Sequence, residues 1–442
     1  MSLKVWGFQE YSPQKQIIFE DIKSIISKSY QQFWYTPIDT PSVEKNKVLL
    51  SKTDQETNKQ IFWLYWLAQW PEDTKKYSLR YDLTVPFARY TIDNINDIDF
   101  PFKRSQIQKV WRWERSQKWR FKEFFQADID VIRPQKRLNS KDQYVYYNSE
   151  IIIVLYKTIQ KILDYFEIDK QPTIHINSRK LINWLLKELL DENQNKKEII
   201  KLFDDYYKIG KEQFKISLED KWLSTSQIEK IIEFTSTNLN LENIKDFIEY
   251  IPNQEFAEWI KNIYQTVKQI KLLSNSLNIN INYKIDPFIV RWLDYYTWIV
   301  FETFIDKDLW SVCSWWKYDN LTQHINKKYK FNGIGWSIWI SRLLTLIFDE
   351  KDTKDLPKTT SNYLFVNFNK TFEDIISLAG KFYNENKNIE IYPYERRIWK
   401  QFKYANQKSI PYVVILWQQE KENQIYKIKN MKTGEEKEYK LK

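Results

Sequence analysis

Hydrophobic positions in the first third of the chain predict a helix followed by extended segments. Residues 13–32 carry isoleucines three to four positions apart, which is the spacing of one helix face. Residues 33–44, FWYTPIDTPSVE, contain two prolines and are predicted to be extended. Residues 104–132 predict two β-strands joined by the polar loop SQKWR. One face of the second strand presents Phe124, Gln126, Asp128 and Asp130.

Further along, the pattern divides the chain into a core, an inserted module and a small C-terminal domain. Isoleucine and leucine stripes at helical spacing dominate residues 171–275, which predicts a helical module inserted between core segments 1–170 and 276–350. A linker rich in charged residues covers 351–361. Strand and helix patterns alternate over 362–442, as in a small α/β domain. The expected fold class is therefore α+β with an added α/β domain.

Composition narrows the function classes. The formal net charge of +10 favours an anionic partner such as nucleic acid, although charge alone favours it weakly. Cys313 is the single cysteine, so no disulfide forms within the chain. The two histidines, His175 and His324, are far apart in sequence, which argues against a histidine-based metal site or a Ser-His-Asp triad. The absence of an apolar leader and of any run of 18 apolar residues predicts a soluble cytoplasmic protein.

Two stretches in the first half combine side chains suited to chemistry. LRYDLTVPFARY, residues 79–90, brings a cation, a carboxylate and a hydroxyl within six positions, although Asp82 or Thr84 could simply cap a helix. VWRWERSQKWRFKEFFQADIDV, residues 110–131, is a basic hairpin, and guanidinium groups bind phosphates in bidentate fashion. Its amide and carboxylates suit an ammonium group and a ring with donor atoms. A salt-bridged hairpin in solvent remains the alternative.

Two stretches in the second half are weaker on their own. RWLDYYTWIVFE, residues 291–302, places two adjacent tyrosines after an arginine, which could be ordinary core and rim positions. In FNGIGWSIWISRLLTLI, residues 331–347, Gly335, Trp339 and Arg342 fall at i, i+4 and i+7 of an expected helix, so that the arginine could reach a phosphate. A lone G-x-G element is weak evidence of phosphate binding.

Taken in order, these stretches resemble the class II aminoacyl-tRNA synthetases, and within them the histidyl-tRNA synthetases. The segment TPIDTPSVE, with Pro41, resembles motif 1 of that class. VWRWERSQKWRFKEF resembles motif 2, and GIGWSIWISRLL resembles motif 3. LRYDLTVPFARY, and RWLDYYTWIVFE followed by WSVCSWWKYDNL, resemble histidyl-specific signatures. YPYERRIWKQFKYANQKSIPYVVIL resembles the anticodon-binding domain of the family. The resemblance covers nearly the whole chain and implies an antiparallel catalytic sheet that activates histidine with ATP and charges tRNA(His).

The resemblance also implies which residues bind histidine. They are Asp82, Thr84, Gln126, Asp130, Tyr295 and Tyr296. The first three would hold the α-amino group. Asp130 and Tyr296 would contact the two imidazole nitrogens, so that a ligand without ring donors and acceptors would be rejected.

A second set implied by the resemblance acts on ATP and tRNA. The ATP-binding residues are Arg112, Glu114, Arg120 and Arg342. Arg112, Arg291 and Arg342 are the implied catalytic residues, because their charges stabilise the phosphates in the transition state. Gln117 and Lys118 are candidates for tRNA contact. Mg²⁺ would bridge the ATP phosphates with no metal-ligating side chain assigned. Family members are homodimers through motif 1, so a homodimer without a membrane anchor is expected.

Tryptophan and glycine occur in abnormal numbers. The chain has 20 Trp and 6 Gly, whereas average usage of about 7% would give roughly 31 glycines. The two counts together come close to that expectation. Tryptophan repeatedly stands where the family pattern has glycine, while Trp111 is expected to be genuine. We therefore hypothesise that UGA codons read as glycine in the organism have been rendered as tryptophan. The positions concerned are Trp34, Trp113, Trp119, Trp292, Trp298, Trp315, Trp316, Trp336, Trp339, Trp399 and Trp417.

Two other functions stay open at this point. One is a catalytically inactive histidyl-synthetase-like regulator, which shares the catalytic fold but lacks the anticodon domain. The C-terminal domain over 362–442 and the retained Arg112, Arg291 and Arg342 argue against it. The other is a non-enzymatic tRNA- or protein-binding module, which genuine tryptophans at the motif positions would favour.

Overall fold

The chain folds into two compact units in a computed structural model. One unit comprises residues 1–9 and 22–347, and the other comprises residues 10–21 and 348–442. The structure describes residues 3–52, 55–64, 76–114, 120–135, 142–191, 194–236, 254–289, 299–305, 311–318, 321–351, 358–368 and 371–441. None of the described helices combines the length and the apolar character needed to cross a membrane.

The N-terminal segment follows the sequence prediction closely. Helix α1 covers Pro13–Gln32, the predicted range, and its buried residues include Ile18, Ile22 and Ile26. The predicted extended segment contributes the short strands β1 and β2. The elements that follow α1 are β1 (Thr36–Pro37), β2 (Val43–Lys45), α2 (Asn46–Leu49), the 3-10 turn η1 (Leu50–Lys52), α3 (Gln55–Asn58), β3 (Trp63–Leu64), β4 (Tyr77–Leu79) and α4 (Thr84–Asp93). Strands β2, β4 and β3 form a small antiparallel sheet.

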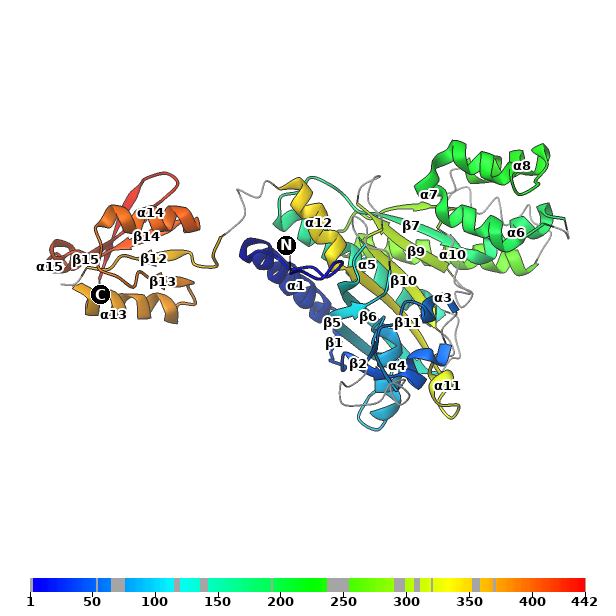
Figure 1. Cartoon of the computed structure of the whole chain (residues 1–442), viewed down its shortest axis with the longest axis horizontal. Helices are drawn as coiled ribbons and strands as arrows, with labels where there is room; N and C mark the ends of the chain where they lie inside the picture. Colours follow the sequence, from blue (N-terminus) through cyan, green and yellow to red (C-terminus); the bar gives the residue numbers. More distant parts are fainter. Residues whose placement is uncertain are drawn as a thin grey trace. The chain divides into compact units, whose positions relative to one another are not determined.

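An eight-stranded sheet forms the centre of the first unit (Figure 1). Its order is β1-β5-β6-β11-β10-β9-β7-β8, antiparallel except for the pairs β1–β5 and β7–β8 at its edges. The strands after β1 are β5 (Phe102–Trp111), β6 (Glu123–Pro134), β11 (Phe331–Trp339), β10 (Cys313–Tyr318), β9 (Ile299–Phe304), β7 (Thr173–Ser178) and β8 (Asn282–Ile285). The hairpin predicted over 104–132 is confirmed by β5 and β6, which pair from Phe102↔Ile132 to Trp111↔Glu123.

The prediction that one helix contains Gly335, Trp339 and Arg342 is wrong for the first two residues. Gly335 and Trp339 lie in strand β11, and only Arg342 is helical, in α12 (Ile340–Glu350). Strand β11 pairs with β6 along its whole length, from Phe331↔Pro134 to Trp339↔Gln126. This long ladder satisfies the backbone groups that a helix would otherwise satisfy, so local spacing did not decide the structure.

The inserted region is mainly helical but contributes one strand to the central sheet. Helix α5 (Asp142–Tyr165) precedes it, and α6 (Arg179–Leu189), α7 (Lys196–Glu219), α8 (Thr225–Ser236) and α10 (Gln254–Ser276) form it, with α6, α7 and α8 clustered in Figure 1. Phe203, Phe214 and Phe288 belong to a separate apolar core there. Strand β7 lies within the range expected for the module, yet it pairs with β8 and β9 of the main sheet.

The second unit contains a five-stranded sheet in the order β13-β12-β14-β15-β16. Its elements are β12 (Tyr363–Phe365), α13 (Phe372–Asn384), β13 (Ile389–Ile391), α14 (Ile398–Lys408), β14 (Tyr412–Ile415), α15 (Gln418–Glu422), β15 (Ile425–Asn430) and β16 (Glu436–Lys440). Helices α13 and α14 cover opposite faces, since Phe365 packs in the α13 core and Leu364 in the α14 core (Figure 1). The predicted alternation of strand and helix is confirmed. The β15–β16 hairpin was not predicted, because its strands are rich in lysine, with β15 only half-buried and β16 exposed.

Candidate functional site

A buried polar face on strand β6 carries two of the predicted histidine-binding residues, Gln126 and Asp130, with Asp128 between them. Gln126, Asp128 and Asp130 alternate along β6 and are at most 2% exposed. Opposite them on β11 stand Trp339, Ser337 and Gly335, respectively. Apolar side chains normally fill such buried positions of a sheet. Burying a carboxylate costs free energy unless the carboxylate is paired with a cation. We call the β6 residues Gln126, Asp128 and Asp130 the polar face.

Arg104 supplies the compensating charge. It is fully buried on strand β5 and lies directly opposite Asp130. Its Nη2 lies 2.6 Å from Oδ2 of Asp130 and 3.6 Å from Oδ2 of Asp128. Burial raises the pKa of Asp128, and the charge of Arg104 opposes that shift. Sequence reasoning missed Arg104. Arg104, Gln106 and Gln108 occur at every second position, which on a strand predicts a polar stripe along one face.

Tyr318 is a second partner that sequence reasoning missed. Its hydroxyl donates to Oδ1 of Asp130 at 3.0 Å, so both carboxylate oxygens of Asp130 are engaged. Burial and the Asp130 charge raise the pKa of this phenol, which keeps it a donor. The ring lies over Gly333 on the neighbouring strand, where an added Cβ would come within 1.9 Å of it. Only glycine at 333 leaves room for Tyr318 in this position.

Asp82 lies at the start of helix α4 and close to the polar face. The N–H of Val85 donates to its Oδ1 at 3.2 Å, so the capping interaction considered for this residue exists. Burial raises the pKa of Asp82 to about 6, and the Val85 hydrogen bond and the charges of Arg112 and Arg104 oppose the shift. Thr84, the first residue of α4, is also buried. Capping and ligand binding are compatible here, because a carboxylate accepts several hydrogen bonds.

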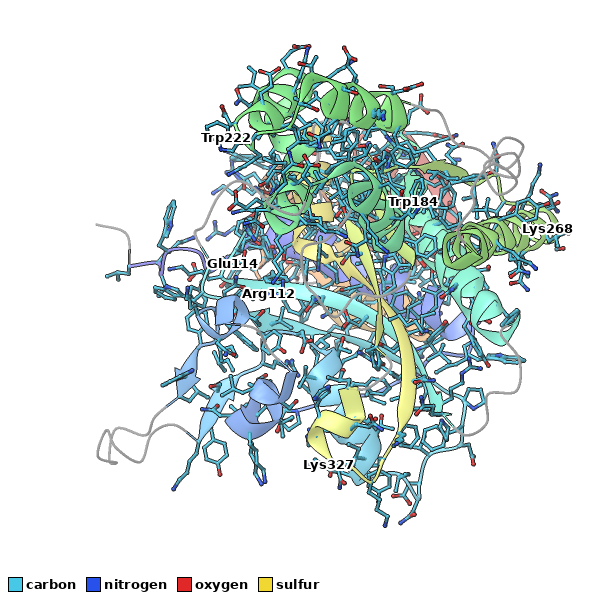
Figure 2. All side chains as sticks on the ribbon, turned by 90° about the vertical axis from the view of Figure 1, so that its right-hand side faces the viewer. Arg112, Glu114, Trp184, Trp222, Lys268 and Lys327 are labelled. Atoms are coloured by element: carbon cyan, nitrogen blue, oxygen red, sulfur yellow. The ribbon has the colours of Figure 1, made fainter. Side chains whose placement is uncertain are left out.

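The predicted phosphate-binding loop begins where β5 ends. Arg112 donates from Nε to the carbonyl of Tyr81 at 2.9 Å, which ties the loop to the segment that carries Asp82. Arg120 pairs with Glu114 across the loop, as the salt-bridged alternative predicted. Figure 2 shows Arg112 and Glu114 next to each other at the end of the sheet. Gln117 and Lys118 lie outside the described residues.

Arg342 follows the last residues of β11. Its Nη1 donates to the carbonyl of Ser311 at 2.7 Å, and the Trp339 ring centroid lies 3.8 Å from its guanidinium carbon. Trp339 pairs with Gln126, and α12 begins at the next residue. Arg342, in the first turn of α12, therefore lies beside the polar face. The structure thus brings the polar face, Asp82, Arg112 and Arg342 to one region of the sheet. Arg291, Tyr295 and Tyr296 lie outside the described residues.

A titratable cluster separate from the polar face lies near the far edge of the sheet. His175 Nδ1 is 2.7 Å from Oδ2 of Asp286, and Tyr207 of helix α7 donates to the same carboxylate. Burial lowers the pKa of His175, while Asp286 opposes the shift. This cluster joins the helical region to the sheet. Within the described ranges no three histidine, cysteine or acidic side chains gather closely enough to hold a metal ion.

Comparison with known proteins gives a consistent result over the full length. The histidyl-tRNA synthetase family profile matches residues 7–343, and an anticodon-binding domain profile matches residues 364–442. The histidine–tRNA ligase of Clostridium tetani is 36% identical, covering 97% of this chain and 93% of the relative. That of Clostridium acetobutylicum is 35% identical, covering 98% and 96%. The crystal structure of histidyl-tRNA synthetase from Nostoc sp. superposes with a TM-score of 0.84 at 26% identity, covering 100% of this chain and 97% of that chain.

Proposed function

The chain belongs to the histidyl-tRNA synthetase family and is a histidine–tRNA ligase, and from this premise we propose that histidine is activated at the polar face. The observation that carries this proposal is the buried Asp130, held between Arg104 and Tyr318. A carboxylate fixed by two donors presents a defined acceptor to an imidazole N–H. Such an arrangement favours a ring with donor atoms over an apolar side chain of similar size.

The α-amino group of histidine binds to Asp82, Thr84 and Gln126 in this proposal. The carboxylate of Asp82 and the amide oxygen of Gln126 are acceptors suited to an ammonium group. Oε1 of Gln126 is buried and has no hydrogen-bond partner among the described residues, and a bound ammonium would supply one. The same positive charge favours ionised Asp82, whose pKa burial raises to about 6 in the free protein. Tyr295 and Tyr296 complete the imidazole side by the resemblance to the family.

In this proposal ATP binds beside the polar face, where it contacts several arginines. Arg112 contacts the α-phosphate, and the Arg120–Glu114 pair holds Glu114 toward the adenine. Arg342 binds the γ-phosphate from the start of α12. Arg291 acts on charge that develops at the α-phosphate. A fixed donor aimed at such charge typically contributes about 3–4 kcal/mol of transition-state stabilisation.

The reaction needs no covalent attachment to the enzyme. The histidine carboxylate attacks the α-phosphorus of ATP, and diphosphate leaves with the electron pair of the broken P–O bond. A ribose hydroxyl of the terminal adenosine of tRNA then attacks the carbonyl of the adenylate, and AMP leaves. The protein contributes position and charge. Mg²⁺ would neutralise phosphate charge and would bind mainly through the phosphates of ATP.

The tRNA is bound by several parts of the chain in this proposal. The C-terminal domain, matched by the anticodon-binding profile, contacts the anticodon of tRNA(His). The helical region supports the acceptor arm, and Gln117 and Lys118 approach its end. The net charge of +10 favours phosphate contacts. We also propose that the chain forms a homodimer through motif 1 and that it is located in the cytoplasm.

A regulatory role without catalysis is the alternative. A structure described as an ATP phosphoribosyltransferase regulatory subunit/histidyl-tRNA synthetase from Bacillus halodurans has a TM-score of 0.69 at 17% identity, which establishes a shared fold alone. The anticodon-binding profile over 364–442 favours the ligase.

Histidine-dependent ATP–diphosphate exchange, measured on protein purified from its native cells, distinguishes these functions. We expect exchange with histidine and at least a hundredfold less with other amino acids, since a lost polar contact in a specific site costs several kcal/mol (on the order of 10² or more in rate). Omission of histidine is the control. Absence of exchange in folded protein that still binds tRNA would reject the ligase in favour of a binding module.

A further inference from the structure

Trp34 occupies a position at the end of helix α1 that glycine normally fills. Its φ is 62°, which is left-handed backbone. Its N–H donates to Gln31 O at 2.9 Å, and Tyr35 N–H donates to Tyr30 O at 3.2 Å. These two bonds form a Schellman motif with residue 34 at the left-handed position. The indole is 85% exposed, so no packing compensates for the strained backbone.

Trp222 has the same left-handed backbone after helix α7. Its φ is 63°, its N–H donates to Glu219 O at 3.0 Å, and its side chain is 89% exposed. Bulky L residues are rare outliers in this conformation because Cβ crowds the following carbonyl. The remaining five described non-glycine residues with positive φ are all polar: Glu167, Asn278, Asn386, Ser409 and Gln424. Trp222 was not among the positions that the sequence pattern singled out.

Trp339 stands on the polar face opposite Gln126. Its ring lies against the guanidinium of Arg342, with the centroid 3.8 Å from the guanidinium carbon. Its Nε1 is buried without a hydrogen-bond partner among the described residues, but so is that of Trp336, so this donor does not distinguish the two positions. What sets Trp339 apart is its place, because the indole fills the space between two predicted ligand-binding side chains, Gln126 and Arg342. This step rests on the proposed function, whereas the argument for Trp34 and Trp222 does not.

Trp336 and Trp111 have the surroundings of genuine tryptophans. Trp336 is fully buried on the opposite face of β11, paired with Ile129 and stacked on Phe301 with centroids 5.8 Å apart. Trp111 donates from Nε1 to Glu123 at 2.9 Å. The sequence pattern placed Trp336 among the expected glycines, and the structure argues against that interpretation. A glycine there would leave a large cavity in the core.

We propose that residues 34, 222 and 339 are glycine in the functional protein, and that residue 336 is tryptophan. One codon decoded as glycine by the native cells accounts for all three positions and for the low glycine count. Left-handed backbone marks residues 34 and 222, whereas residue 339 is assigned from its place beside Gln126 and Arg342. The proposal goes beyond the ligase function, because it concerns which residues the ribosome inserts.

Peptide mass spectrometry of the protein from its native cells tests this directly. Trypsin releases residues 29–45 with Trp34, 222–230 with Trp222, and 331–342 with both Trp336 and Trp339. We expect the first two peptides to be lighter by the Trp-to-Gly mass difference. The third should be lighter by one such difference, with fragment ions placing it at 339. Tryptophan at any of residues 34, 222 and 339, or glycine at 336, would overturn the proposal, whatever the enzymatic activity.

Recombinant variants give a second test that needs no native cells. Trp34→Gly should raise the midpoint of thermal unfolding by about 1–2 °C, because relief of a left-handed L residue stabilises the helix end. Trp336→Gly is the matched control and should lower the midpoint by about 4 °C or more through its cavity. A lower midpoint for Trp34→Gly would contradict the assignment.

Discussion

Strands β6 and β11 present two buried faces built from the same ladder, and the faces differ in what fills them. On the apolar face, Ala127, Ile129 and Val131 lie opposite Ile338, Trp336 and Ile334. On the polar face, Asp130 and Asp128 share the charge of Arg104. Both faces exclude water, but only the apolar one gains free energy simply by doing so. Buried charge that packing does not require therefore marks the ligand site.

This comparison predicts opposite responses to substitution on the two faces. The variants below are made in the glycine-decoded chain, in which glycine replaces Trp222 and every tryptophan of the sequence hypothesis except Trp336. Stability is measured by denaturant unfolding, and activity by histidine-dependent exchange.

Arg104→Leu should have the largest effect. Removing one member of a buried charge group typically costs about 3–5 kcal/mol of unfolding free energy, since Asp130 and Asp128 would remain together without a cation. Exchange activity should be lost as well. Lys109→Leu on the same strand is the matched control. Its pair with Glu123 at 2.7 Å is partly exposed, so the loss should stay below about 1 kcal/mol. Equal losses for both variants would mean that Arg104 is not the charge that holds the polar face.

Asp82 should make stability depend on pH. Burial raises its pKa from 3.8 to about 6, so the folded state binds this proton more tightly than the unfolded state. Its contribution is complete below pH 4 and is lost as pH rises toward 6, by about 3 kcal/mol in total. Asp82→Asn should remove this part of the slope in unfolding measured from pH 4 to 7. An unchanged slope would show that Asp82 is solvated in the folded protein.

Tyr318→Phe removes a single hydroxyl from the polar face. We expect an unfolding cost of about 1–2 kcal/mol, because one buried acceptor bond of Asp130 is lost. The KM for histidine should rise about tenfold while the KM for ATP stays constant, since the hydroxyl orients the imidazole acceptor. Equal changes in both KM values would indicate a general structural role.

Ile129→Val should have the smallest effect and acts on the apolar face. Removing one methylene from this fully buried position typically costs about 0.5–1.5 kcal/mol. Exchange kinetics at saturating substrates should not change. A loss of exchange activity in Ile129→Val protein that remains folded would contradict the distinction between the two faces.

Sequence patterns predicted the elements that local periodicity determines. Helix α1, the β5–β6 hairpin and the alternation of the C-terminal domain were predicted because each follows from residues close in the chain. The strand at Gly335 and Trp339 was not, because its state depends on pairing with β6. Tyr318, one of the two partners of Asp130, was missed for the same reason. Tyr318 is 188 positions away from Asp130, and a single sequence carries no sign of that contact.

Calorimetric titration of histidine into the glycine-decoded chain tests the central claim most directly. Asp130→Asn keeps the size of the side chain but removes its negative charge, while Ile129→Val alters the neighbouring position on the opposite face. We predict that Asp130→Asn weakens histidine binding at least tenfold, or by about 1.4 kcal/mol or more, and that Ile129→Val leaves it unchanged. Unaltered binding by a folded Asp130→Asn protein would contradict the assignment of the polar face as the histidine site.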